Sequence, residues 1–168
     1  KGVLGLTSNP TIFEKAISSG SLYDADIVRF SESFSDKSQI FEKLAVQDIK
    51  KAADLMRPIY EETDSLDGMV SLEVNPHLAN NTQDTILEAR RLHKAVDRPN
   101  LMIKVPATEE GMPAITTLIS EGINVNVTLI FSTDMYSKVR KAYIDGLGQL
   151  SESGGDLSSV SSVASFFV

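Results

Sequence analysis

Short apolar runs rich in β-branched residues alternate along the chain with longer segments whose apolar positions recur about every 3.6 residues. The short runs predict strands at residues 2–7, 69–74, 101–105, 124–130 and 160–168. The longer segments predict helices at residues 12–17, 22–30, 37–61, 82–95, 113–120 and 133–147. Alternation of strands and helices indicates an α/β protein with a parallel sheet.

Polar residues at the predicted strand ends separate two architectures. A doubly wound sheet that binds nucleotides carries a glycine-rich loop after its first strand, and residues 5–10 match neither common fingerprint. A TIM-type (β/α)8 barrel instead collects its chemistry from the carboxyl ends of many strands. Polar side chains do fall there in this chain: Asn9, Glu73, Lys104, Asn126, Thr128 and Ser165. The sequence therefore favours a (β/α)8 barrel.

The chain accounts for only part of such a barrel. Five predicted β/α units would be a fraction of the eight that close a barrel of about 250 residues. The sequence begins without methionine and stops inside an apolar run. We therefore expect residues 1–168 to be one partial barrel domain within a longer protein, with the first and the last strands of the barrel outside it.

The amino-acid composition disfavours several classes of binding partner and of metal site. The formal net charge of −7 repels nucleic acids and anionic membranes, and no apolar stretch approaches the roughly 20 residues that span a bilayer. Without cysteine there are no disulfides and no thiolate chemistry, which fits a cytoplasmic protein. With only two histidines, a zinc site of His and Cys is disfavoured.

Lys104 is the most informative single residue, because it is the only charge in the apolar run from Leu101 to Pro106. Burial disfavours the ammonium form of a lysine, and a neutral amine can attack a ketone to form an imine. A lysine whose amine reaches solvent, or is paired with Glu73, is the structural alternative. Glu73 ends the preceding strand, where its carboxylate could activate water or serve as that counter-ion.

The fourth predicted strand carries polar residues on one face. Asn124, Asn126 and Thr128 alternate with Val125, Val127 and Leu129, so the polar set would line the barrel interior and the apolar set would meet the helices. Asparagine is disfavoured within strands, which favours a hydrogen-bonding site over a satisfied internal polar layer.

Several of these segments together resemble the transaldolase family, over essentially the whole chain. The matching motifs are TSNPTIF at residues 7–13, SLEV at 71–74, IKVPAT at 103–108, GINVNVTLIFS at 122–132 and ASFFV at 164–168. The long insertion between the first two motifs resembles that of the longer bacterial-type transaldolases.

The resemblance implies a class I mechanism that needs neither a metal nor another cofactor. Lys104 would form a Schiff base with a ketose phosphate, while Glu73 and Thr128 position the water of imine formation and hydrolysis. Asn9, Asn126 and Ser165 would bind the dihydroxyacetone unit, and Phe167 would shape the pocket. The reaction would be that of the non-oxidative pentose phosphate pathway, from sedoheptulose 7-phosphate and glyceraldehyde 3-phosphate to erythrose 4-phosphate and fructose 6-phosphate.

Two departures from the family pattern limit what this chain can do alone. The acid/base aspartate is expected before Lys1 and the phosphate-binding arginines after Val168, and neither Asp24 nor Arg140 lies in a matching motif. A fructose 6-phosphate aldolase that needs no acceptor, and a non-catalytic sugar-phosphate-binding protein, are the competing interpretations. Open sheet edges also favour association, a homo-oligomer included.

Overall fold

The computed structural model describes residues 2–167, which form two compact units. The first comprises Lys1–Val70 and Ala95–Asn100, and the second comprises Ser71–Lys94 and Leu101–Val168. Lys1 and Val168, the ends of the predicted partial barrel domain, lie outside the described residues. That these residues constitute a single domain stays a prediction.

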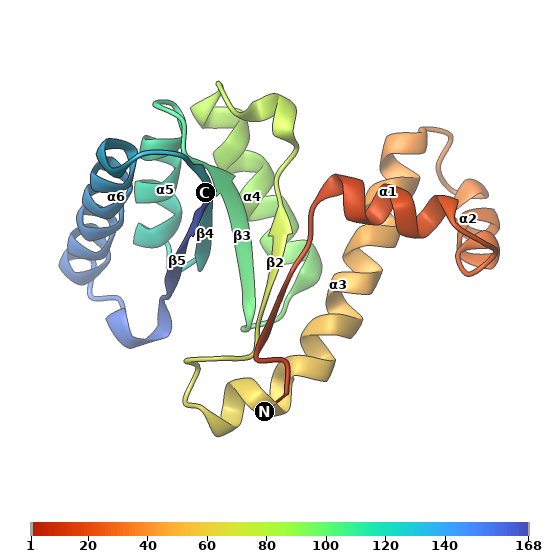
Figure 1. Ribbon diagram of the computed structural model, residues 1–168, viewed down its shortest axis with the longest axis horizontal. Coiled ribbons are helices and arrows are strands. Elements are labelled where there is room, and N and C mark those ends of the chain that lie inside the picture. The colour runs from red at the N-terminus through yellow and green to blue at the C-terminus, as the bar shows by residue number, and fades with distance from the viewer. Residues whose placement is uncertain (1, 168) are drawn as a thin grey trace. The chain divides into compact units, whose positions relative to one another are not determined.

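The first unit consists of one short strand followed by helices (Figure 1). Its elements are β1 (Gly5–Thr7), α1 (Pro10–Ser18), α2 (Asp24–Ser31) and α3 (Lys37–Glu62). α1 begins two residues before the predicted helix, because the Asn9 side chain accepts a hydrogen bond from the Ile12 N–H at 2.8 Å and Pro10 takes the first helical position. The Gly68 N–H, just before β2, donates to the Leu4 carbonyl at 2.6 Å and so places the chain before β1 beside the start of β2.

The second unit alternates strands and helices. Its elements are β2 (Met69–Glu73, from Ser71 onward), α4 (Thr82–Val96, up to Lys94), β3 (Leu101–Pro106), α5 (Gly111–Ser120), β4 (Val125–Ile130), α6 (Thr133–Glu152) and β5 (Ser162–Phe166), with short 3-10 helices at Pro76–Leu78 and Leu157–Ser159. The side chains of Asn81 and Ser132 cap α4 and α6, accepting hydrogen bonds from the backbone N–H groups of their first turns.

The strands of the second unit lie in sequence order, β2-β3-β4-β5. β4 is parallel to both of its neighbours, and Lys104 pairs in register with Asn126. Every residue of β3 is buried, as expected of a parallel strand covered on both faces. Parallel strands joined in sequence order through helices are the repeat of a (β/α) barrel, so the predicted fold class, a partial TIM-type barrel, is confirmed.

β4 departs from the predicted alternation at Leu129. Val125 and Val127 are fully buried, but Leu129 is 41% exposed and has a φ of 61°. The register between β4 and β5 shifts between Val127 and Ile130, so an extra residue bulges out of the ladder there. The expectation that Leu129 packs against the helices was wrong, because a bulge reverses the face to which the following side chain points.

Candidate active site

Lys104 and Glu73 form a buried ion pair at the ends of adjacent strands. The Lys104 Nζ lies 3.2 Å from Glu73 Oε2, and the two side chains are only 10% and 14% exposed. Lys104 comes from the second half of β3, and Glu73 is the last residue of β2. The structure thus joins the two residues that the sequence singled out, and the lysine amine is turned to the carboxylate rather than to solvent.

The pair is costly to bury, which makes it informative. Moving an ammonium and a carboxylate out of water costs several kcal/mol per ion, and their mutual attraction offsets this only when the geometry is good. An apolar pair of similar volume would hold two strands together at least as well. An amine beside a carboxylate is also the arrangement that proton transfer to and from a lysine requires.

Asn126 lies next to Lys104 and is held by two hydroxyl groups. Its Nδ2 donates to Ser71 Oγ at 3.1 Å, and its Oδ1 accepts from Ser165 Oγ at 2.8 Å. Asn126 is only 5% exposed, so its side chain is fixed by protein groups. A line of hydrogen bonds therefore runs from β2 through β4 to β5, past the lysine.

Asn124, just before β4, and Thr128, within it, are buried like Asn126 but differ from it in their contacts. Asn124 bonds backbone groups on both sides, the Leu101 carbonyl at 3.2 Å and the Ser161 N–H at 2.8 Å, which is a structural role. Thr128 is 4% exposed and pairs in register with Pro106, two residues beyond Lys104. Thr128 therefore lies nearer the carboxyl end of the strands than Asn126 does.

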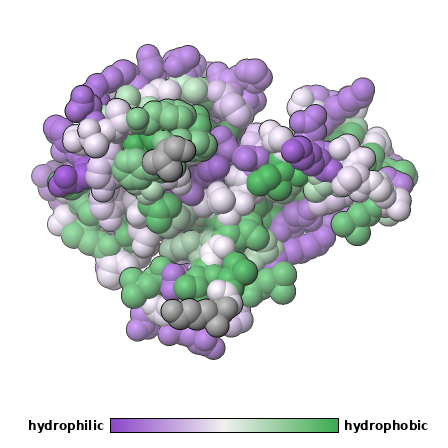
Figure 2. Space-filling model, in the orientation of Figure 1, coloured by the Kyte–Doolittle hydropathy of each residue, from purple (hydrophilic) through white to green (hydrophobic). Residues whose placement is uncertain are grey.

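Two further predicted site residues have other side-chain contacts. Asn9 belongs to the first unit, where its side chain caps α1. Phe167 directly follows β5, is 51% exposed, and its ring lies 5.3 Å from that of Phe131. On the face drawn in Figure 2, apolar residues gather over the β4 and β5 side of the second unit. Phe167 is thus positioned by an apolar contact and not by the polar cluster.

Ser71 is the residue that the sequence prediction missed. It lies on β2 two positions before Glu73, so both side chains point to the same face of the sheet. That parity, within the otherwise apolar run Met69 to Leu72, is the signal that could have found it. A serine within a strand carries little information until its partner is known.

The described residues contain no group of three His, Cys, Asp or Glu side chains arranged to hold a metal ion. Among the same residues, no helix is both long enough and apolar enough to cross a membrane. The polar groups that converge on the strand ends are an amine, a carboxylate, an amide and hydroxyls. Such a set suits covalent chemistry on a carbonyl and the binding of hydroxyl groups.

Fold and site together define a class of protein, a (β/α) barrel with a buried amine near the carboxyl end of a strand. The comparison with known families then makes this specific. Residues 1–168 match the family described as Transaldolase/Fructose-6-phosphate aldolase, and the chain belongs to that family.

Similar proteins include transaldolases of several bacteria. The chain is 51% identical to the transaldolase of Trichodesmium erythraeum and 52% identical to that of Thermobifida fusca, in each case over all 168 residues. It is 48% identical to the transaldolase of Mycolicibacterium smegmatis over the same length. The aligned region covers 44%, 46% and 45% of these relatives, so the chain spans less than half of their length.

Proposed function

We propose that the chain carries the Schiff-base centre of a transaldolase, which transfers a dihydroxyacetone unit between sugar phosphates in the non-oxidative pentose phosphate pathway. The observation that carries the proposal is the buried Lys104–Glu73 pair, with Asn126 in register beside the lysine. Transaldolases that are about half identical over the whole chain support the same activity.

Lys104 supplies the nucleophile in this mechanism. Glu73, at 3.2 Å, accepts a proton from the Lys104 ammonium, and the neutral amine that results attacks the ketone carbon of the ketose phosphate to form a carbon–nitrogen bond. Glu73 passes this proton and a second one from the nitrogen to the carbonyl oxygen, which leaves as water, and the protonated imine remains. Thr128, one step nearer the strand ends, positions the water that forms here and later hydrolyses the imine.

The protonated imine then accepts the electron pair of the adjacent carbon–carbon bond. The aldose leaves as an aldehyde once its hydroxyl proton is removed, and no residue of this chain is assigned to that step. Asn126 and Ser165 hold the hydroxyl groups of the retained dihydroxyacetone unit, and Phe167 shapes the pocket. The binding role of Asn9 stays a prediction. An aldose phosphate, glyceraldehyde 3-phosphate or erythrose 4-phosphate, then accepts the unit by the reverse sequence.

The decisive test is borohydride reduction of the full-length protein that carries this sequence, in the presence of fructose 6-phosphate. We expect peptide mass spectrometry to find a dihydroxyacetone-sized adduct on Lys104 and none in the Lys104→Ala variant. Lys141→Ala is the matched control, because Lys141 is an exposed lysine paired with Asp145 on α6. A folded wild-type protein without an adduct would rule out the Schiff-base proposal.

The acceptor separates the two activities in the family description. Turnover that requires glyceraldehyde 3-phosphate or erythrose 4-phosphate marks a transaldolase, and acceptor-independent cleavage of fructose 6-phosphate marks an aldolase. A cytoplasmic location is part of the proposal, supported by a sequence without cysteine. The homo-oligomer expected from the open sheet edges stays a prediction.

A further inference from the structure

The amide of Asn126 has a defined donor and acceptor side in this structure. Ser71 Oγ accepts from Nδ2 at 3.1 Å, and Ser165 donates its hydroxyl hydrogen to Oδ1 at 2.8 Å. One Nδ2 hydrogen is used by Ser71, which leaves the second one to donate. Ser165 uses its hydrogen on the amide, so its oxygen is left to accept. With this arrangement, Asn126 is a donor toward a ligand and Ser165 is an acceptor.

Ser71 is placed to maintain this arrangement from two strands away. It comes from β2, whereas Asn126 comes from β4, so their hydrogen bond crosses the face of β3 that carries Lys104. Both residues are buried, at 4% and 5% exposure. Loss of the Ser71 hydroxyl would leave Nδ2 of this buried amide without that partner, and the side chain would be held by Ser165 alone.

We infer that Ser71 is a positioning residue for the proposed reaction: its hydroxyl holds the Asn126 side chain beside Lys104, in the place from which Asn126 and Ser165 bind the hydroxyl groups of the ketose. The inference rests on the proposed function. Ser71 acts through Asn126.

Removal of the Ser71 hydroxyl should weaken productive binding of the ketose. In Ser71→Ala, kcat/KM for fructose 6-phosphate should fall about tenfold, the equivalent of a single hydrogen bond. Most of the change should appear as a higher KM for the ketose, with KM for the aldose acceptor unaltered. Ser71→Thr keeps the hydroxyl and should restore most of the activity.

Ser162→Ala is the matched control. Ser162 is a half-buried serine of β5 whose hydroxyl donates to the Val125 carbonyl at 2.9 Å, so its removal also deletes one hydrogen bond of the sheet. The Ser162 hydroxyl does not bond Asn126 in this structure, so kcat/KM of the Ser162→Ala variant should match that of the wild type. A loss shared by Ser71→Ala and Ser162→Ala would show a general weakening of the sheet and overturn the inference.

A double-mutant cycle tests whether Ser71 acts through Asn126. In an Asn126→Ala background, the further change Ser71→Ala should have no additional effect on kcat/KM, because there is no amide left to hold. Additive losses would overturn the inference. If Ser71→Ala does not fold, Ser71→Cys replaces it in the cycle, since a thiol has nearly the shape of the hydroxyl but is a weak acceptor.

Borohydride trapping of the wild type, run in parallel, distinguishes failure of the inference about Ser71 from failure of the proposed function. An adduct on Lys104 with equal kcat/KM for wild type and Ser71→Ala would overturn the role of Ser71 and leave the proposed function standing. Absence of the adduct in wild type would overturn the proposed function and the inference with it.

Discussion

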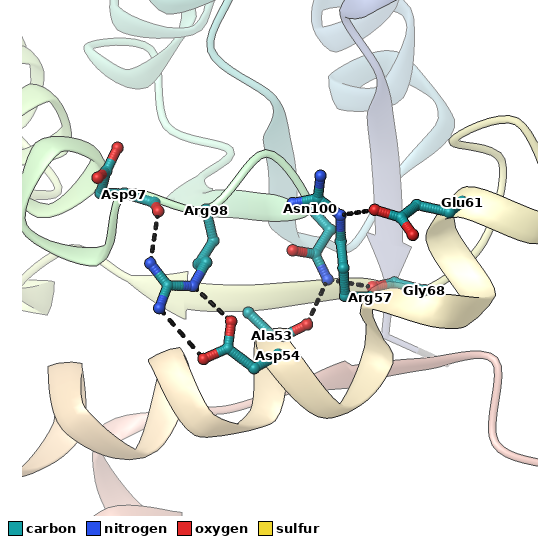
Figure 3. Close-up of polar contacts among 8 residues, drawn as sticks. All are labelled: Ala53, Asp54, Arg57, Glu61, Gly68, Asp97, Arg98 and Asn100. Carbon is teal, nitrogen blue, oxygen red and sulfur yellow. Dashed lines mark hydrogen bonds and ion pairs between the residues drawn. The ribbon is translucent and has the colours of Figure 1, made fainter.

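Two buried asparagines, Asn126 in the second unit and Asn100 in the first, differ in what their side-chain hydrogen bonds join. In the second unit, Ser71, Asn126 and Ser165 bond one another through their side chains. In the first unit, Asn100 bonds only backbone, donating from Nδ2 to the carbonyl oxygens of Ala53 and Gly68 at 2.9 Å each (Figure 3). Bonds to backbone fix the path of the chain, whereas bonds among side chains leave groups that can exchange partners with a ligand.

The cluster around Asn100 connects three segments of the first unit. Asn100 reaches α3 through Ala53 and the turn before β2 through Gly68. Beside it, the Arg98 guanidinium forms a two-pronged contact with Asp54, at 2.5 and 3.1 Å (Figure 3). Gly68 has a φ of 77°, and a Cβ there would lie 2.4 Å from the Tyr60 nitrogen, so this turn requires glycine.

Position along the strands agrees with this division of roles. Asn100 immediately precedes β3, whereas Lys104 lies in its second half. In (β/α) barrels the carboxyl ends of the strands carry the chemistry and the amino ends carry stability. Substitutions around Lys104 should therefore reduce activity more than stability, and substitutions around Asn100 should reduce stability more than activity.

Removal of the whole ion pair should abolish activity without loss of stability. In Lys104→Met/Glu73→Gln we expect activity to fall by about a thousandfold or more, because the nucleophile is gone. The free energy of unfolding should stay the same or rise by about 1–4 kcal/mol, since two buried charges are removed together.

Urea denaturation and the acceptor-dependent assay measure both quantities. The matched control, Lys141→Met/Asp145→Asn, removes an exposed pair of α6 and should change the free energy of unfolding by less than about 1 kcal/mol. If the double variant at Lys104 and Glu73 were destabilised by several kcal/mol, the pair would be structural and the contrast between the clusters would fail.

The opposite result is expected in the first unit. Asn100→Ala leaves the carbonyl oxygens of Ala53 and Gly68 without their donor, and the free energy of unfolding should fall by about 2–4 kcal/mol. The yield of the Lys104 adduct per folded molecule should not change. Asn80→Ala, at an exposed asparagine, serves as the control. A variant of normal stability with reduced adduct yield would contradict the structural role of Asn100.

The smallest expected effect is a pH dependence of the Arg98–Asp54 contact. The hydrogen bond from Arg98 holds the pKa of Asp54 below its usual range. Because the folded pKa lies below the unfolded one, Asp54 contributes stability above its unfolded pKa and loses it as the pH falls through the folded pKa.

Wild type should therefore be slightly more stable than Asp54→Asn at neutral pH, and the difference should vanish in acid. High salt should reduce the same difference at neutral pH, because the pair is exposed to solvent. Denaturation curves of wild type and Asp54→Asn, recorded from neutral pH into the acid range, measure this difference in stability. A difference that grew on acidification would contradict the assigned direction of the shift.

Residues whose signal is local could be predicted well from the sequence. Helix starts depend on a few neighbouring residues, and α4 and α6 begin where they were expected, at Thr82 and Thr133. The polar face of β4 follows from strand alternation, and Asn124, Asn126 and Thr128 are all buried. The Lys104–Glu73 contact followed from the order of adjacent strands.

Only the tertiary structure decided which polar groups meet across strands and segments. Ser71 and Asn126 are 55 residues apart, and Asn100 and Ala53 are 47 apart, so no spacing along the chain marks either contact. The bulge at Leu129 depends on the register with β5, which no pattern within β4 reveals. Periodicity determined which residues are strand, helix and buried face, because it is a property of neighbouring residues. Sheet twist and register determined the hydrogen-bond partners, because they arise only when distant strands pack together.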